Sequence, residues 1–203
     1  AAKTLTTPGD PAVAVVNAVD QIMSREKLSG QEIDRVVHAT TLFTNALIEH
    51  KGAKTALLTT EGFRDSLEIG RERKYDLYDL AAKKPRQLAP RDRRFEVPER
   101  ILADGTIHRA LDEQSLEQII VALRDQNIES IGIVFLHSYR NGDHERIAGE
   151  KITKCLPEIS VSLSCDVAPE IREYERASTT VANAYVKPLA RDYLEALGKR
   201  LGS

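Results

Sequence analysis

Residues 38–52 hold the densest group of side chains in this sequence that could do chemistry. His38, Thr40, Thr41 and Asn45 follow a short apolar run there, and apolar residues then recur at helical spacing. This pattern predicts a strand that ends at residues 38–40 and a helix that is capped by Thr40 or Thr41. The free N–H groups and the positive end of the helix dipole can hold phosphate or a developing oxyanion at such a turn. A simple helix cap is the commoner reason for such hydroxyl residues, so both interpretations stay open.

The other histidines do not belong to a metal-binding motif. His137, His144 and Glu145 are close in sequence, but no His-Glu-x-x-His or Cys-x-x-Cys pattern accompanies them. Cys155 and Cys165 are the only cysteines, which is too few for a structural zinc site. We therefore expect no dedicated metal site.

Nucleophilic catalysis and phosphate binding also lack a complete local motif. Ser138 and Cys165 fall near strand ends, as Thr40 and Thr41 do, but no Gly-x-Ser-x-Gly turn is present. Nothing in the sequence predicts the lowered pKa that Cys165 would need as a nucleophile. No Walker-type glycine-rich loop exists, so the chain lacks an evident complete phosphate cradle. Four carboxylates could act as acids or bases, although such groups mostly keep a surface solvated: Glu68, Glu170, Glu173 and Glu175.

The composition is that of a soluble globular protein. With 203 residues, the chain suits one large domain or two small ones, and it can bury a core. Hydrophobic residues make up 41%, charged residues 30%, and the formal net charge is -2, which gives no reason to expect nucleic acid or a membrane. The sparse cysteines fit a reducing cytoplasm. The chain does not begin with Met, so we expect a processed or truncated protein.

The first part of the chain predicts one βαβ unit. A helix should begin at Pro11, with Asp10 as its N-cap, and run to about residue 27. Residues 36–38 should form a strand, and the following helix should end at Gly52 in a left-handed conformation. Residues 55–60 should form a second strand, parallel to the first.

The last part of the chain predicts a second βαβ unit. Asp112 should cap a helix, and residues 131–136 should form a central strand buried on both faces. A helix over 144–155 and a strand over 159–164 follow. The final helix should cover residues 177–201, with a kink or break at Pro188.

Between these units the periodicity lapses. Residues 72–100 are rich in Lys, Arg and Pro, which indicates a solvated loop or lid; a nucleic-acid patch is a poor alternative because acidic residues are mixed in. Residues 95–108 should include a hairpin turned by Asp104-Gly105. The expected organisation is a first βαβ region over 1–71, a loop and hairpin insertion over 72–110, and a second βαβ region with the long helix over 111–203, together one compact α/β unit.

Four groups of residues, in a fixed order along the chain, are specific enough to indicate a protein family. They are residues 38–41 with 44–47; 59–65 with 67–71 and 75–77; 136–141 with 144–145; and 169–176 with 178–181 and 183–186. In this order they resemble the N-terminal region of the hydantoinase A / 5-oxoprolinase family. The resemblance covers nearly the whole chain.

The resemblance implies a fold and an activity. The fold would be α/β, with a mixed, largely parallel sheet that is part of an actin-like (ribonuclease H-like) ATPase. The activity would be ATP-dependent opening of a cyclic amide, such as 5-oxoproline or a hydantoin, with ATP and Mg²⁺ in the full-length enzyme. Phosphorylation of the amide oxygen would make the carbonyl carbon open to attack by water. The alternatives are a subunit of an acetone or acetophenone carboxylase, and a non-catalytic binding or assembly domain.

The resemblance also implies missing parts and partners. Family members usually carry an Asp-x-Gly-Gly-Thr phosphate-binding loop just upstream of the sequence segment found here at residues 3–8. They also have a large C-terminal half with a second phosphate-binding motif. The expected partners are the rest of the polypeptide, a hydantoinase B-type subunit or domain, and the cyclic amide. Ala39 stands where the family commonly has Gly, and Cys165 where it commonly has His.

The candidate site residues follow from this resemblance. His38, Thr40, Thr41 and Asn45 would line the substrate or phosphate side. Three residues would form a neighbouring wall, in which Arg64 or Arg71 would hold an anionic substrate: Arg64, Asp65 and Arg71. Three secondary candidates complete the set: His137, Glu173 and Arg176.

Overall fold

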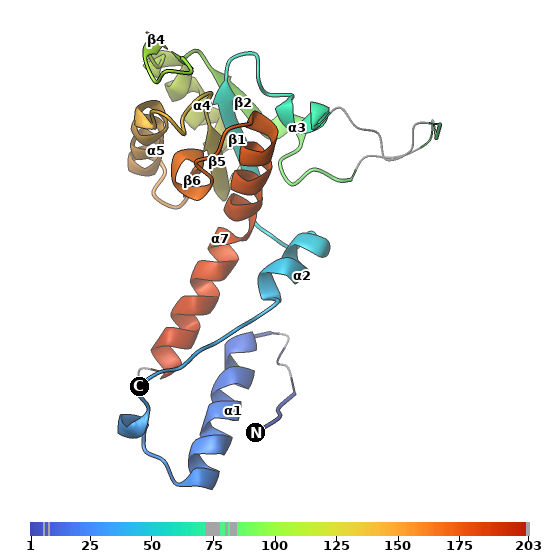
Figure 1. The fold of residues 1–203 in the computed structure, drawn as a ribbon, viewed down its shortest axis with the longest axis vertical. Helices are drawn as coiled ribbons and strands as arrows, with labels where there is room; N and C mark the ends of the chain where they lie inside the picture. Colours follow the sequence, from blue (N-terminus) through green and yellow to red (C-terminus); the bar gives the residue numbers. More distant parts are fainter. Residues whose placement is uncertain (6, 8, 72–77, 80, 82–84, 202–203) are drawn as a thin grey trace. The chain divides into compact units, whose positions relative to one another are not determined.

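The computed structural model describes residues 1–5, 7, 9–71, 78–79, 81 and 85–201 (Figure 1). Contacts between residues divide the chain into two compact units. The terminal unit consists of Ala1–Asn45 with Leu189–Ser203, and the sheet unit of Ala46–Pro188. Because helices α2 (Leu42–Ile48) and α7 (Glu173–Leu201) each run from one unit into the other, the two units are covalently continuous at two places.

The sheet unit is built on four parallel strands in the order β2-β1-β5-β6. The strands are β1 (Thr55–Thr60), β2 (Arg94–Val97), β5 (Ser130–Val134) and β6 (Ser160–Leu163). The predicted parallel α/β sheet is therefore confirmed, as is the parallel pair formed by β5 and β6. The antiparallel pair is a separate hairpin, β3 (Arg100–Ile101) with β4 (Ile107–Arg109), as the Asp104-Gly105 turn predicts.

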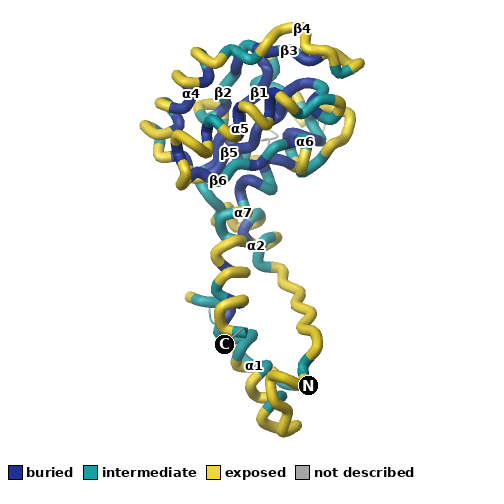
Figure 2. Tube along the Cα trace, turned by 90° about the vertical axis from the view of Figure 1, so that its left-hand side faces the viewer, coloured by how far each residue is buried: buried dark blue, intermediate teal, exposed yellow. Residues whose placement is uncertain are grey.

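Apolar side chains alternate between the two faces of this sheet, since neighbouring strand residues point in opposite directions. Leu58 and Ile133 pack with helices α4 (Glu113–Asp125) and α5 (Asp143–Cys155) in the larger core cluster. Leu57 and Val134 pack with Val181 of α7 in the second cluster. Strands β1 and β5 are consequently buried along their whole length, as Figure 2 shows.

Short helices and local caps complete the sheet unit. They are α3 (Ser66–Ile69), the 3-10 helix η2 (Arg91–Arg93) and α6 (Ser164–Val167). The predicted cap of α4 is confirmed, because the Asp112 carboxylate accepts the N–H groups of Gln114 and Ser115 at 3.0 and 3.3 Å.

The terminal unit contains α1 (Pro11–Glu26), the 3-10 helix η1 (Gly30–Glu32) and the end of α7. The predicted start of α1 is confirmed, since the Asp10 carboxylate accepts the Ala12 N–H at 3.0 Å. Ala12 packs with Tyr193 and Leu197 of α7, and Arg200 pairs with Asp10 at 2.6 Å. This small cluster is the apolar core of the unit.

The predicted strand at residues 36–38 is wrong. Residues 33–41 form neither helix nor strand, and the Val37 side chain is 85% exposed. A strand needs a neighbour to pair its N–H and C=O groups, and no described strand pairs with this segment. The first βαβ unit is therefore absent, and β1 pairs instead with β2 and β5.

Two local predictions also need correction. His50, with a φ of 54°, adopts the left-handed conformation after α2, whereas Gly52 allows close approach of the chain to Tyr185. The predicted break at Pro188 is wrong, because helix α7 runs continuously through this residue, whereas the alternative, a kink, stays a prediction. A proline removes only one N–H donor, and buried residues such as Ala184 and Leu197 hold the turns on both sides.

The three expected regions do not coincide with the two compact units. Strand β2 lies inside the expected insertion over 72–110, yet it belongs to the main sheet. Much of the predicted loop or lid falls on residues 72–77, 80 and 82–84, which lie outside the described residues. The division at 71 and 110 stays a prediction.

Candidate functional site

The carboxyl ends of the parallel strands bring polar side chains together, as open α/β sheets do at ligand sites. The buried polar residues at this edge come from strand ends, the loops that follow them and the first turns of helices: Thr60, Glu99, Ser138, His144, Glu145, Ser164 and Arg176. We call them the edge network. They form two groups of hydrogen bonds that meet at the loop after β5.

Glu145 is the centre of the first group. Its fully buried carboxylate accepts the N–H groups of Phe135 and Cys165, both at 2.8 Å, and the Ser164 hydroxyl at 2.6 Å. The Ser164 hydroxyl lies 3.0 Å from that of Ser138. One carboxylate therefore joins the end of β5 to the start of α6.

Arg176 extends this group from α7. Its guanidinium donates to the Ser138 hydroxyl and to the Phe135 carbonyl oxygen, both at 2.7 Å. Burial lowers the pKa of Arg176, and the negative charge of Glu145 opposes that shift. The Nε of Arg176 is buried without a partner among the described residues. The loop after β5 is thus held from two sides by opposite charges.

Glu99 is the centre of the second group. Its carboxylate accepts the Thr60 hydroxyl and lies 2.7 Å from Nδ1 of His144. Thr60 in turn accepts the Leu136 N–H at 3.0 Å. These contacts tie the loop before β3 to the ends of β1 and β5 and to the first turn of α5.

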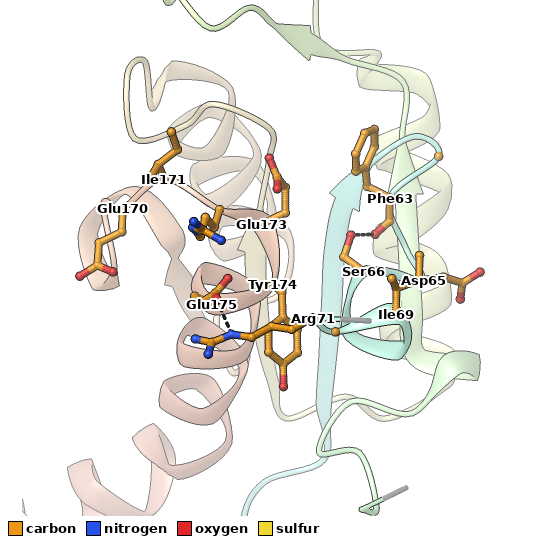
Figure 3. Close-up of a pocket in the computed structure, with 13 residues that line it drawn as sticks. Phe63, Asp65, Ser66, Ile69, Arg71, Glu170, Ile171, Glu173, Tyr174 and Glu175 are labelled. Atoms are coloured by element: carbon orange, nitrogen blue, oxygen red, sulfur yellow. Dashed lines mark hydrogen bonds and ion pairs between the residues drawn. The ribbon is translucent and has the colours of Figure 1, made fainter. Parts of the chain in front are cut away.

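An open groove of about 1060 Å³ lies between residues 62–71 and 170–175. In Figure 3, Phe63 and Ile69 line one wall, and Glu173 and Tyr174 line the other. Arg71 reaches across, and its Nε pairs with Glu175 at 2.7 Å. The lining includes four carboxylates and two guanidinium groups: Asp65, Glu170, Glu173, Glu175, Arg71 and Arg172. This charge balance favours a neutral or cationic ligand over a polyanion.

The four candidates from the first turn lie in the terminal unit. Thr40 caps α2, because its hydroxyl accepts the Leu42 N–H at 3.1 Å. Nε2 of His38 lies 2.7 Å from the hydroxyl oxygen of Tyr193. Thr41 and Asn45 are exposed. The cap interpretation of Thr40 is confirmed, and the role of all four residues in binding stays a prediction.

The other candidates lie in the sheet unit. Asp65, Arg71 and Glu173 line the groove, whereas Arg64 does not. The Asp65 carboxylate also accepts hydrogen bonds from Nε and Nη2 of Arg91, at 2.9 and 3.0 Å. These bonds hold the pKa of the Asp65 carboxyl below its usual range. The structure therefore brings together three of the predicted residues in one groove.

The two remaining secondary candidates are His137, in the loop after β5, and Arg176, in the first turn of α7. His137 has a φ of 55°, a conformation that non-glycine residues seldom adopt. Its Nδ1 is buried without a partner among the described residues, and its ring lies 6.0 Å from that of Tyr139. Arg176 holds the same loop through Phe135 and Ser138. Strain and an unpaired ring nitrogen thus mark His137.

Sequence reasoning named neither Glu99 nor Thr60 as a site residue, and it noted Glu145 only as a possible metal ligand and as part of the residues that resemble the family. The signal for Glu145 was available, since a carboxylate in the first turn of a helix can accept N–H groups across a strand end. No such local signal exists for Glu99, whose partner Thr60 lies 39 residues away. The described residues contain no group of three or more metal-ligating side chains, and no described helix could span a membrane.

Cys165 is a poor nucleophile in this environment. Burial and the neighbouring Glu145 carboxylate both disfavour the thiolate, so the pKa of Cys165 is raised to about 12. In a Cys155→Ser variant, we expect alkylation of Cys165 by iodoacetamide to be roughly a thousandfold slower than that of a free thiol near pH 7. The rate should still be rising at pH 10, where the rate of a free thiol with a pKa of about 8.5 has levelled off. A plateau below pH 9 would contradict this environment.

Comparison with known proteins places these features in a family. Residues 1–156 match the model of the hydantoinase/oxoprolinase N-terminal region. The chain is 44% identical, over 95% of its length, to an uncharacterized protein of Methanocaldococcus jannaschii. It is 38% identical to caprolactamase subunit alpha of Pseudomonas jessenii over 99% of its length, and 34% identical to the acetophenone carboxylase gamma subunit of Aromatoleum aromaticum over 92%.

Solved structures agree with these matches. The crystal structure of ATP-dependent caprolactamase from Pseudomonas jessenii is 37% identical, with a TM-score of 0.84 over 97% of this chain and 30% of that one. A nucleotide-free acetone carboxylase structure has a TM-score of 0.85 over 98% of this chain and 30% of that one, at 23% identity, a likeness of fold. The chain spans 28%, 30% and 28% of the three sequence relatives.

Proposed function

This chain belongs to the hydantoinase/oxoprolinase family, and we propose that it forms the N-terminal part of an ATP-dependent enzyme that opens cyclic amides. The observation that carries the proposal is the likeness to ATP-dependent caprolactamase, which extends over 97% of the chain at 37% identity. Caprolactam, hydantoins and 5-oxoproline all contain a ring amide, so ring-amide hydrolysis includes every substrate that the family and relative names mention. The substrate within this class is left to the experiment below.

The proposed reaction has three steps. The γ-phosphoryl group of ATP is transferred to the amide oxygen, which releases ADP and makes the carbonyl carbon electrophilic. Water then attacks this carbon and the C–N bond of the ring breaks, which leaves an acyl phosphate on the opened chain. A second water hydrolyses the acyl phosphate, so that phosphate is released and the carbon becomes a carboxylate. The products are a ring-opened amino acid, ADP and phosphate. The proposal places ATP and Mg²⁺ in the full-length enzyme, in the cytoplasm, and assigns none of the Mg²⁺ ligands to the described residues.

The groove fits the amide better than the nucleotide. Its four carboxylates against two guanidinium groups disfavour the triphosphate, whereas a neutral ring such as that of caprolactam or hydantoin is not repelled. Ile69 and Ile171 are 60% and 68% exposed at its walls, so ring methylene groups could cover them on binding. Arg71 and Glu175 supply a donor and an acceptor that could bind the amide oxygen and N–H.

Turnover by the full-length enzyme, with its partner subunit where one exists, tests the proposal. Caprolactam, 5-oxoproline and hydantoin would each be supplied with MgATP, and ring-opened product and phosphate would be measured together. We expect one phosphate per ring opened for one of these amides. Phosphate release that none of the amides stimulates would contradict the proposal.

A carboxylase subunit is the second candidate, favoured by the 34% identity to the acetophenone carboxylase gamma subunit. In this case the phosphorylated species would be an enol or a carboxylate. ATP consumption that requires a ketone and bicarbonate, together with co-purification of large partner subunits, would select this candidate. The third candidate is a binding or assembly domain. Micromolar binding of MgATP to the 203-residue chain would contradict our expectation that the chain alone binds nucleotide weakly or not at all.

Adjacent threonines provide a matched test of the first turn. Thr41→Ala in the full-length enzyme should lower turnover by more than roughly tenfold, because the Thr41 hydroxyl makes no hydrogen bond among the described residues and is available to a ligand. Thr40→Ala should instead lower the free energy of unfolding by about 1 kcal/mol, since its hydroxyl caps α2. Denaturant titration and steady-state turnover of both variants separate the two roles. Unchanged turnover in Thr41→Ala would contradict a role of Thr41 in binding and would leave it only a structural role.

A further inference from the structure

A second pocket lies at the opposite edge of the sheet from the groove. It occupies about 540 Å³, within the range of small-ligand pockets. Residues 52–54 precede β1, Arg93 precedes β2, Arg94 is its first residue, and Glu129 precedes β5, so the pocket borders the amino ends of three strands. It shares no lining residue with the groove. We call it the amino-edge pocket.

The lining of the amino-edge pocket is rich in positive charge. Its cationic side chains outnumber its carboxylates by five to two: Lys54, Arg86, Arg91, Arg93 and Arg94 against Glu68 and Glu129. His50 adds an imidazole to the lining. In contrast to the groove, this pocket is therefore suited to an anion.

Three of the cations are already held by the protein. Arg94 is almost fully buried, donates to the Ala89 carbonyl oxygen at 2.8 Å and pairs with Glu68 at 3.1 Å. Lys54 donates to the Gln126 carbonyl oxygen at 2.6 Å. Arg91 is held by both oxygens of Asp65. These contacts fix the positions of the three charges around the pocket.

Arg86 and Arg93 are different. Neither side chain makes a hydrogen bond or an ion pair with any residue that the structure describes. The two carboxylates of the lining are engaged elsewhere, because Glu68 pairs with Arg94 and Glu129 accepts the backbone N–H of Lys54 at 2.6 Å. Two guanidinium groups thus line the pocket, and neither has a hydrogen-bond acceptor among the described residues.

We propose that the amino-edge pocket binds a small multivalent oxyanion, with Arg86 and Arg93 as its direct ligands. A guanidinium group offers paired N–H donors that match two oxygens of a phosphate or a carboxylate. Arg94 and Lys54 add fixed positive charge behind them. The site is separate from the proposed function, because it needs neither the cyclic amide nor ATP.

Calorimetric titration of the 203-residue chain tests this site. Inorganic pyrophosphate should bind saturably at 50 mM NaCl, and binding should weaken as the salt concentration rises. Arg86→Gln and Arg93→Gln should each weaken binding roughly tenfold, as expected for loss of a charge-assisted contact. Arg124→Gln is the matched control, since Arg124 is exposed on α4 and does not line the pocket. This control should bind as the unchanged chain does.

A second titration with tricarballylate distinguishes the two oxyanion sources. Tighter binding of pyrophosphate assigns the site to phosphate groups, and tighter binding of the tricarboxylate assigns it to carboxylates. Absence of saturable binding for both probes would overturn the proposal. An equal loss in Arg124→Gln would also overturn it, because the effect would then reflect net charge alone. Circular dichroism of each variant checks that the fold is retained, and the turnover test above is unaffected by either outcome.

Discussion

Glu145→Ala is expected to lower the free energy of unfolding by about 3 kcal/mol or more. The substitution leaves the buried N–H groups of Phe135 and Cys165 and the Ser164 hydroxyl without their acceptor. Each buried donor without a partner costs about 1–3 kcal/mol. Arg176 also loses the nearby negative charge that opposes its desolvation. Denaturant titration followed by circular dichroism measures the loss.

Two further variants separate the charge from the location of Glu145. Glu150→Ala removes an exposed carboxylate from the same helix and should change stability by less than about 0.5 kcal/mol. Glu145→Gln keeps the side-chain shape and one oxygen acceptor, so its loss should lie between the other two. If Glu145→Ala were no worse than Glu150→Ala, the edge network would contribute nothing measurable to folding.

The elements that could be predicted are those with signals close together in the sequence. Asp112 and Asp10 cap the helices that follow them, as the residue types predict, and both accept N–H groups within three positions. The continuous apolar run at 131–136 predicted a strand buried on both faces, and β5 is that strand. Local capping and burial patterns do not depend on distant residues, which explains this success.

Other features depend on partners that the sequence does not identify. Val36 and Val37 have the residue types of a strand, but pairing with another strand decides whether one forms, and the two side chains are 50% and 85% exposed. The edge network is similarly non-local, since Arg176 reaches Ser138 across 38 residues and Ser164 reaches Glu145 across 19. The resemblance to a family selected Arg176 as a candidate, whereas the hydrogen bonds that hold it required the fold.

The candidate site shows the same limit. One groove contains three residues that were predicted from the family resemblance: Asp65, Arg71 and Glu173. The segment that contains Asp65 and Arg71 lies more than ninety positions before the one that contains Glu173. Sequence could not predict the ion pairs of these side chains, such as Arg71 with Glu175 and Asp65 with Arg91. Those pairs determine the local charge, and therefore which ligands the groove favours.

Arg176→Met is the second variant with a large expected effect. Methionine can fill much of the space that the arginine stem occupies, but it cannot donate to the Phe135 carbonyl oxygen or the Ser138 hydroxyl. The Glu145 carboxylate also loses the positive charge that opposes its burial. We expect a loss of about 2–4 kcal/mol in the free energy of unfolding, measured by denaturant titration. A loss below about 0.5 kcal/mol would show that solvent reaches this edge of the sheet.

Combining Arg176→Met with Glu145→Gln tests whether the two charges act on each other. Each single variant leaves one buried charge without its counterpart, whereas the double variant removes both charges together. The loss in the double variant should therefore be smaller than the sum of the two single losses by about 1–2 kcal/mol. Arg176→Met with Glu150→Ala is the matched pair, and its losses should add because Glu150 is exposed. Additive losses in both pairs would mean that Arg176 and Glu145 stabilise the loop after β5 independently, through their hydrogen bonds alone.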